Sequence, residues 1–454
     1  MATVTLTCGL GFGDEGKGTF VDFLSRRRST TLVVRYNGGA QAAHNVVSGE
    51  RHHTFAQWGS GTFAGVPTLL SRHMLLNPIF ALSEAKVLEG KGVKSPLSLL
   101  FVERGAVLTT PFHVAMNRLR ELSRTLRHGS CGMGIGETMQ DVVDDADDVL
   151  RAGDLEDLPR ARRLMDSVRV RKLAAARALG LPAELLSHPA AEREMSMLSE
   201  PSVVELALER YRAFARAARL VGPEHLERTL AAPGQIVFEG AQGALLDQDM
   251  GFQPYTTWTD ITFRNADELL SRFSGEVTRL GVLRAYTTRH GAGPMVTAMP
   301  SWDRLSSHDH NQWGEWQGSF RSGPLDLVAT RYALRVVGGV DGLLLSNLDR
   351  LALLGGPRIP ICDRYEGTWG EAFRDERGEI RVVRPCDLVH QERLAQALAQ
   401  VRPVLTQLTR TRYAEEVAEL LGVRLMATSH GPRTQHKRSL FASRNEERCS
   451  IGVL

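Results

Sequence analysis

Short, uninterrupted apolar runs mark the first predicted strands of the chain. Val4 to Cys8 is predicted to be a buried strand that enters a glycine-rich turn, and Thr19 to Arg28 is the predicted helix after it. Leu32 to Tyr36 is the second predicted strand, and it ends at Asn37-Gly38-Gly39. Strands of this kind are typical of a parallel sheet that is covered on both faces.

Later segments repeat this form and predict the rest of the sheet. Ile236 to Glu239, Leu280 to Tyr286 and Gly342 to Leu348 are short and apolar, and each leads into a polar or glycine-rich loop. The tail from Val401 contains a predicted helix, Ala414 to Leu421, and a short strand around Arg424 to Thr428. We therefore expect an α/β fold, a mostly parallel twisted sheet flanked by helices, with ligands outside the carboxyl ends of the strands.

The stretch from about Asp141 to Ala232 differs from the rest of the chain. It is rich in Ala, Leu, Arg and Glu, with apolar residues at helical spacing, which predicts a mainly helical insertion. The insertion either supports the sheet as a solvated layer or takes a direct part in binding. We find no repeat, low-complexity tract or Pro/Ser-rich linker, which favours one catalytic unit over residues 1–454.

Composition narrows the class of protein. Of the 454 residues, 43% are hydrophobic and 24% are charged, which is typical of a globular protein with a substantial core. A formal net charge of +3, without basic blocks, gives no indication of nucleic-acid or membrane binding. The five cysteines form no CxxC pair, so neither a disulfide framework nor a zinc site is expected. With no signal peptide pattern and no long apolar run, we expect a cytoplasmic protein.

The turn after the first strand has the pattern of a phosphate-binding loop. Gly11 is followed by four residues and then by Gly16-Lys17, which nearly satisfies the P-loop spacing. Glycines allow backbone N–H groups to surround phosphate oxygens, and Lys17 adds a positive charge. Gly18 stands where a P-loop has a Ser or Thr that binds Mg²⁺, and the carboxylate of Asp14 could take that metal-binding role.

Several blocks of the chain resemble the adenylosuccinate synthetase family, in the family's order. They begin with Asp14-Glu15-Gly16-Lys17-Gly18 and Val33 to Gly39, followed by His44-Asn45-Val46. The likeness returns at Gly132 to Gly136, Phe238 to Gly243, Leu245 to Asp247, Pro254-Tyr255, Tyr286 to Arg289, Gly291 to Pro294 and Ser429 to Pro432. These blocks span nearly the whole chain, which makes the resemblance much more specific than a single glycine motif.

The resemblance implies a two-step ligation with Mg²⁺ as the metal. In this family GTP phosphorylates the 6-oxygen of IMP, and the amine of aspartate then displaces the phosphate. Asp14 matches the general base and a metal ligand, and the carbonyl of Ala43, where the family has Gly, matches a second metal ligand. His44 matches the donor that stabilises the moving phosphoryl group, which is the kind of electrostatic contribution on which phosphoryl transfer depends.

The resemblance also implies the residues that bind the two nucleotides. For GTP and its phosphates they are Gly13, Glu15, Gly16, Lys17, Gly18, Asn347, Asp349, Ser429, Gly431 and Pro432. Asp349 matches the aspartate that reads guanine, whereas Asn347 stands where the family usually carries Lys. For the purine nucleotide that is modified they are Gln41, Cys131, Gln242 and Thr257, with Gln41 in place of Asn and Cys131 in place of Thr.

Two stretches depart from the family pattern. The family supplies an arginine for the IMP phosphate soon after Gly136, where this chain has the acidic run Asp141 to Asp148. The family's aspartate-binding loop corresponds to Glu315 to Arg321, in which only Arg321 remains of a basic run. Either nearby arginines such as Arg304 compensate for the missing basic residues, or the chain uses a different amine. The tract Ser307 to Asn311 is interpreted as a polar loop rather than a metal site.

The leading hypothesis is therefore a GTP-dependent ligase that joins an amine, by resemblance L-aspartate, to C6 of a purine nucleotide, by resemblance IMP. A homodimer acting on small molecules is expected by the same resemblance. One alternative is a specialised paralogue that uses a different amine or purine nucleotide. A further alternative is a non-catalytic GTP-binding protein, against which the presence of Asp14, Lys17 and His44 argues.

Overall fold

The computed structural model describes residues 1–27, 29–124, 129–145, 147–306, 316 and 318–441. Its strands are β1 (Thr3–Gly9), β2 (Thr30–Arg35), β3 (His44–Ser48), β4 (Arg51–Phe55), β5 (Thr68–Leu70), β6 (Leu100–Glu103), β7 (Arg219–Val221), β8 (Gln235–Glu239), β9 (Val277–Arg284), β10 (Thr287–His290), β11 (Phe320–Gly323), β12 (Leu325–Asp326), β13 (Gly342–Ser346), β14 (Arg358–Glu366), β15 (Arg402–Thr409), β16 (Leu425–Ser429) and β17 (Lys437–Ser439).

Its α-helices are α1 (Lys17–Ser25), α2 (Pro78–Gly90), α3 (Pro111–Ser123), α4 (Ile135–Asp144), α5 (Leu158–Ala178), α6 (Ala183–Leu186), α7 (Pro189–Ser199), α8 (Ser202–Ala217), α9 (Glu224–Ala231), α10 (Arg264–Leu269), α11 (Leu327–Val336), α12 (Leu388–Leu398) and α13 (Tyr413–Leu421). Several begin at a residue that caps the helix. The side chain of Asn77 accepts from two N–H groups in the first turn of α2, and Asp157 and Asp326 cap α5 and α11 in the same way.

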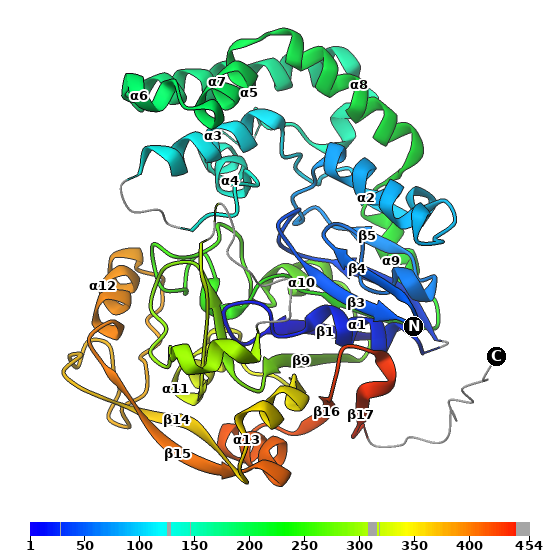
Figure 1. The fold of residues 1–454 in the computed structure, drawn as a ribbon. Coiled ribbons are helices and arrows are strands. Elements are labelled where there is room, and N and C mark those ends of the chain that lie inside the picture. The colour runs from blue at the N-terminus through cyan, green and yellow to red at the C-terminus, as the bar shows by residue number, and fades with distance from the viewer. Residues whose placement is uncertain (28, 125–128, 146, 307–315, 317, 442–454) are drawn as a thin grey trace.

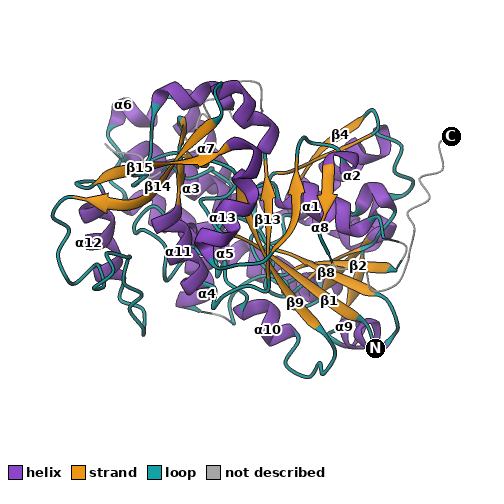
Figure 2. Ribbon diagram, turned by 90° about the horizontal axis from the view of Figure 1, so that it is seen from below, coloured by secondary structure: helices purple, strands orange, loops and turns teal. Residues whose placement is uncertain are grey.

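A ten-stranded sheet forms the centre of the molecule, in the order β17-β16-β13-β9-β1-β8-β2-β5-β6-β7. Its neighbouring strands pair in parallel, except for β16 and β17. Helices cover the sheet in Figures 1 and 2. The predicted α/β class with a mostly parallel, helix-flanked sheet is confirmed.

The helices α3, α5, α7 and α8 pack on one another and form a layer at the top of Figure 1. This layer shares an apolar core with β5 and β6 that is separate from the larger core around β1, β8 and α11. The segment expected to be a helical insertion holds α5 to α9. It also contains β7, which pairs with β6 at the edge of the main sheet.

The carboxyl ends of β1, β9 and β13 lie side by side, because β9 pairs with both of the other strands. The predicted elements at these ends are present with shifted bounds. The helix expected from Thr19 begins at Lys17, and the strand expected to reach Leu348 ends at Ser346 because Asn347 has a positive φ of 58°. Among the described residues, no helix has the length and apolar character that crossing a membrane requires.

Candidate active site

The loop between β1 and α1 has the backbone of an anion-binding turn. Gly13 and Gly16 have φ of 94° and 85°, in the region that favours glycine, and Gly16 directly precedes the first turn of α1. Asp14 has a φ of 56°, which an Asp adopts only at some energetic cost. The loop therefore leads its N–H groups to the amino end of a helix, where an anion is favoured.

Glu15 and Lys17 brace this loop from within. Glu15 is 2% exposed, and its Oε1 accepts from the N–H groups of Gly11 (3.0 Å) and Gly13 (2.8 Å). Its Oε2 lies 2.5 Å from Nζ of Lys17, which is 4% exposed. Buried charges must be paired, and this pair keeps a positive charge next to the loop. The Glu15 side chain thus shapes the loop, and its backbone N–H is the group left for phosphate binding.

Gly18 has a steric reason to be glycine. A Cβ atom at this position would lie 2.7 Å from Cβ of His44 and 3.0 Å from Oγ of Ser60. His44 at the start of β3 therefore occupies the space that the side chain of a P-loop Ser or Thr would need. The glycine at position 18 is thus both the departure from the P-loop pattern and the reason why His44 can lie close to the phosphate loop.

His44 is oriented by a buried carboxylate. Its Nδ1 lies 2.6 Å from Oε1 of Glu239, which is fully buried at the end of β8. Ser60 holds this carboxylate in turn, donating its backbone N–H to Oε2 at 2.9 Å and its hydroxyl to Oε1. Burial lowers the pKa of His44, an effect that the Glu239 carboxylate opposes. With Nδ1 engaged, Nε2 is the ring nitrogen left to face a ligand.

Asp14 is the most accessible carboxylate of the loop. Its side chain is 27% exposed, and its Oδ2 lies 3.4 Å from Nε2 of His290 at the end of β10. The His290 ring packs edge-on against Phe320, at 4.5 Å between centroids. A partly exposed carboxylate within reach of an imidazole is suited to exchange a proton with a bound substrate.

The residues expected to bind the guanine base gather at the ends of β13 and β16. Asp349 is half-exposed, and Asn347 starts the turn before it. Ser429 is buried and donates to the carbonyl of Gly431 at 3.0 Å, and the carbonyl of Pro432 accepts from Thr19 of α1 at 2.9 Å. A Cβ atom at Gly431 would lie 2.3 Å from Nδ1 of His436, so the turn requires glycine there.

Lys437 stabilises the same turn through hydrogen bonds. Its Nζ donates to the carbonyls of Gly431 and Arg433, both at 3.0 Å, and also to the hydroxyl of Thr19. Burial lowers the pKa of Lys437 to about 8, and Asp22 and Asp349 partly oppose that effect. The shape of the turn therefore depends on an ammonium group with a perturbed pKa.

Gln41 and Gln242 lie on either side of Gly38-Gly39. A Cβ atom at Gly38 would lie 3.1 Å from Oε1 of Gln242, and one at Gly39 would lie 2.9 Å from Oε1 of Gln41. Buried amide atoms of both glutamines lack a hydrogen-bond partner among the described residues. Buried polar groups are normally paired, so these amides fit a site that a polar ligand completes.

Of the other two expected purine contacts, Cys131 lies in the loop before α4 and Thr257 in the loop between β8 and α10. Burial raises the pKa of Cys131 to about 11, so its thiol is neutral and can only bond weakly. Thr257 bonds through its N–H to the carbonyl of Leu246 at 2.9 Å, and the side chain of the next residue, Trp258, packs near Gly136 in the first turn of α4. The loop that carries Thr257 thus approaches a helix amino end, where phosphate is favoured.

Arg321 is held by the backbone of the loop between β10 and β11. Its Nη2 donates to the carbonyls of Gly291 (2.7 Å) and Gly293 (2.9 Å). Arg289 bonds similarly to Ala292, Pro294 and Tyr255, so both arginines fix this loop. The tract Ser307 to Asn311 and Glu315 of the altered loop lie outside the described residues, so their assignments stay predictions.

The first and last carboxylates of the acidic run after Gly136, those of Asp141 and Asp148, are paired within the chain. Asp141 is 5% exposed and contacts His113 (3.0 Å), Lys172 (2.7 Å) and Arg171 (3.1 Å). Asp148 pairs with the same arginine. These carboxylates join α4 to α3 and α5, and they are not simply repulsive groups beside a phosphate.

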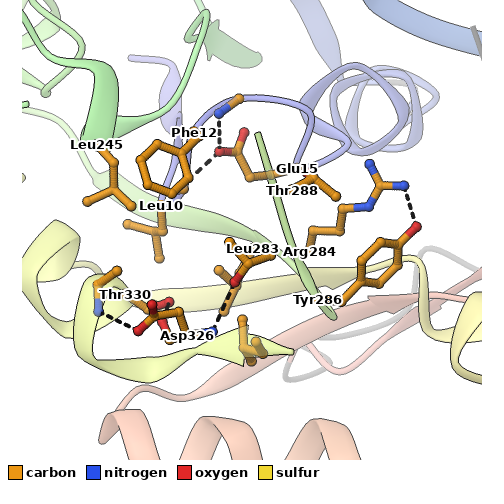
Figure 3. A pocket seen from close by; sticks show the side chains of 15 residues that line it. Leu10, Phe12, Glu15, Leu245, Leu283, Arg284, Tyr286, Thr288, Asp326 and Thr330 are labelled. Carbon is orange, nitrogen blue, oxygen red and sulfur yellow. Dashed lines mark hydrogen bonds between the residues drawn. The ribbon is translucent and has the colours of Figure 1, made fainter. Parts of the chain in front are cut away.

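A small cavity lies beneath the phosphate loop, and Gly13 and Glu15 of that loop are among the residues that line it (Figure 3). Its volume of about 20 Å³ leaves room for little more than a water molecule. Leu10, Leu245 and Leu283 line it, and Glu15 and Arg284 lie at its edge. It is a small gap in the packing of side chains beneath the loop.

The donors expected for a metal fit Mg²⁺. Asp14 offers a partly exposed carboxylate, and Ala43, which is exposed, offers a backbone carbonyl beside His44. Mg²⁺ takes oxygen ligands, keeps several waters and uses substrate phosphates rather than an all-protein cage. The described residues contain no cluster of three or more His, Cys, Asp or Glu side chains suited to hold a metal.

Sequence reasoning missed the roles of Glu239 and His290. Glu239 belongs to a block that resembles the family, but its partner His44 lies 195 residues away. His290 falls between two such blocks. The signal available for Glu239 is a polar side chain at the end of a predicted strand, whereas His290 ends β10, for which the sequence predicts no strand.

Comparisons with known proteins agree over the length of the chain. A family model described as adenylosuccinate synthetase matches residues 6–437. The adenylosuccinate synthetase of Desulfovibrio desulfuricans is 31% identical over 449 residues, which cover 94% of this chain and 97% of that protein. That of Symbiobacterium thermophilum is 32% identical over 426 residues, which cover 91% and 89%.

Solved structures share the fold. The fully ligated adenylosuccinate synthetase from Plasmodium falciparum superposes with a TM-score of 0.75 at 19% identity, covering 96% of this chain and 99% of the other. The succinoaminodeoxyadenylate synthetase of cyanophage S-2L, bound to dGMP and dATP, superposes with a TM-score of 0.58 at 14% identity, covering 97% and 95%.

Proposed function

Because the chain belongs to the adenylosuccinate synthetase family of GTP-dependent C–N ligases, we propose that it joins the amine of L-aspartate to C6 of IMP. The observation that carries this proposal is the convergence of Asp14, Lys17 and His44 at one loop, in a chain that matches the family from residue 6 to residue 437. The comparisons favour neither a paralogue with other substrates nor a non-catalytic GTP-binding protein.

Asp14 and His44 divide the first step between them. Asp14 takes the N1 proton of IMP, so that the 6-oxygen attacks the γ-phosphorus of GTP. His44 donates through Nε2 to the phosphoryl oxygens, which requires its protonated form. Glu239 and the incoming phosphate charge both favour that form, and they oppose the effect of burial on its pKa. The amine of aspartate then displaces phosphate from C6.

The remaining predicted residues keep their assignments as proposals. Gly13, Glu15, Gly16, Lys17 and Gly18 bind the GTP phosphates, chiefly through the backbone and the Lys17 ammonium. Asn347, Asp349, Ser429, Gly431 and Pro432 hold the guanine. Gln41, Cys131, Gln242 and Thr257 bind the purine nucleotide, which the unpaired amides of the two glutamines support. Arg321 shapes the amine site by fixing the loop at Gly291 and Gly293.

Asp14 and the carbonyl of Ala43 would hold Mg²⁺ together with the nucleotide phosphates and water. When bound, the ion supplies positive charge that offsets the charge of the phosphates. A homodimer is proposed from the resemblance to the family, whose active site lies near the subunit interface.

Phosphate release by the purified protein tests the proposal. With Mg²⁺, GTP and IMP present, turnover should depend on aspartate, and ATP should not replace GTP. Asp14→Asn should lower turnover by about 10²- to 10⁴-fold, the usual contribution of a general base, with the fold kept. Asp166→Asn, at a half-exposed carboxylate of α5, is the matched control and should behave as wild type.

Two results would count against this assignment. Turnover of Asp14→Asn at the wild-type rate would remove Asp14 as the base. GTP binding without aspartate-dependent turnover, over a range of IMP concentrations, would remove the proposed reaction itself.

A further inference from the structure

Arg284, the last residue of β9, connects the phosphate loop to the loop that precedes Asp349. It is 5% exposed, and its Nη1 donates to the backbone carbonyl of Asp14 at 3.3 Å. Its Nη2 donates to the hydroxyl of Tyr286 at 2.5 Å, and the guanidinium lies 4.5 Å from the centre of that ring (Figure 3). When the oxygen of the Asn347 amide faces the guanidinium, it accepts from Nε at 2.7 Å and from Nη2 at 3.1 Å.

The contact with Asp14 sets the direction of a peptide group. In a trans peptide the C=O and the following N–H point in opposite directions. Arg284 holds the carbonyl of Asp14, and Ser346 donates its hydroxyl to the carbonyl of Glu15 at 2.6 Å. The N–H groups of Glu15 and Gly16 therefore point away from these two strand ends, in the direction from which a phosphate must be bound.

The same contact supports a backbone conformation that is otherwise unfavourable. Asp14 has a φ of 56°, and a non-glycine residue in this region costs on the order of 1–3 kcal/mol. The bond from Arg284 has a charged donor, and at 3.3 Å it offsets part of that cost. Arg284 therefore helps to hold the backbone of the phosphate loop in this conformation.

At its other end the guanidinium faces the turn that reads the base. Arg284 and Ser346 are register partners in the parallel pairing of β9 and β13, and Asn347 follows directly after Ser346. The charged guanidinium of β9 is thus bonded to the amide that begins the turn after β13.

We propose that Arg284 is a positioning residue that couples the phosphate loop to the guanine-reading turn. The identity of the nucleotide rests on the proposed function, but the coupling does not require that ligation occurs. Arg284 acts through the backbone of Asp14 and through Asn347, and it need not touch the substrates.

A reciprocal exchange tests this coupling by GTP binding at equilibrium, with IMP binding measured separately by calorimetry. Arg284→Met keeps an unbranched side chain over Tyr286 but removes the charge and its donors. It should weaken GTP binding about tenfold or more and leave IMP binding within twofold of wild type. Asn347→Lys alone should also weaken GTP binding, because two cations would then share one site. In the double variant, Asn347→Lys should recover most of the loss caused by Arg284→Met.

A purely structural role gives a different pattern. Equal losses of GTP and IMP affinity in Arg284→Met would overturn the proposal, as would an Asn347→Lys effect that is the same with and without Arg284. If Arg284→Met does not fold, Tyr286→Phe removes one partner of the guanidinium and should raise the GTP dissociation constant about threefold. No change there would also overturn it. A wild-type protein that binds GTP without ligation would refute the proposed function alone.

Discussion

At the scale of single residues, Gly18 determines how close two parts of the site can come. Its missing side chain lets the start of β3 pack against the first turn of α1, so that His44 lies next to the phosphate loop. Glu239 then fixes the ring from the opposite side at 2.6 Å. A serine or threonine after Lys17, as in a P-loop, is not compatible with a histidine in this place.

Restoring the P-loop residue by Gly18→Ser should therefore impair the enzyme. The new Cβ would lie 2.7 Å from Cβ of His44, which must move away from Glu239. We expect turnover to fall about a hundredfold, because misplacing a catalytic group by about 1 Å has an effect of that order. Steady-state phosphate release measures it. Gly90→Ser, at a helical glycine with nothing within 4 Å, is the control, and full activity of Gly18→Ser would contradict the argument.

Lys437 gives the proposed guanine-binding turn a dependence on pH. Below its pKa of about 8 the ammonium donates to the carbonyls of Gly431 and Arg433, and above that pH it loses its charge. We expect the dissociation constant of GTP to rise about three- to tenfold between pH 7 and 9, the effect of losing about one hydrogen bond. Fluorescent GTP titration across this range measures the change.

Lys437→Met provides the reference for this titration. It should bind GTP weakly at every pH, and its profile accounts for ionisation of the guanine itself. A wild-type profile parallel to that of Lys437→Met would show that Lys437 does not control the turn.

At the scale of elements, buried charges fix α4 between its neighbours. Asp141 contacts His113 of α3 and both Arg171 and Lys172 of α5. Burial acts to raise the pKa of Asp141, but His113 and Lys172 outweigh it and hold the pKa well below the usual range. Its carboxylate is thus ionised at neutral and mildly acidic pH.

Asp141→Asn should destabilise the protein by about 2 kcal/mol, because it removes the closer of the two carboxylates that are paired with the buried ammonium of Lys172. Since the folded pKa is depressed, this stabilisation is present above the unfolded value near 4 and is lost as the pH falls below it. Urea unfolding at pH 7 and pH 3.5 measures the difference. Asp144→Asn, at an exposed position of α4, should change stability by no more than about 0.5 kcal/mol. Stabilisation by Asp141→Asn would disprove this role.

The sequence predicts elements better than it predicts contacts between them. Apolar runs such as Val4 to Cys8 are recognisable because a strand buried on both faces admits few polar residues. The three-residue strand β7 is too short to leave such a pattern. Likewise, His44 and Asp14 stand out by resemblance, whereas the bond between Arg284 and Asp14 joins residues 270 apart and depends on strand order.

At the scale of the whole molecule, one sheet supports both halves of the site. The carboxyl ends of β1, β9 and β13 carry the phosphate loop, Arg284 and the guanine-binding turn. The helical layer of α3, α5, α7 and α8 has its own core and reaches the site through α4. Strand β7, which directly follows α8, belongs to the main sheet. The layer and the sheet are therefore joined by hydrogen bonds as well as by packing.

The central place of β1 has a consequence for synthesis on the ribosome. It emerges long before its two neighbours, which begin only at Gln235 and Val277. At about 5–20 residues per second, β8 follows β1 after on the order of 10–50 s. During that interval an apolar strand is present without either neighbour, so the nascent chain exposes it, and the phosphate loop forms late although it precedes both neighbours in the sequence.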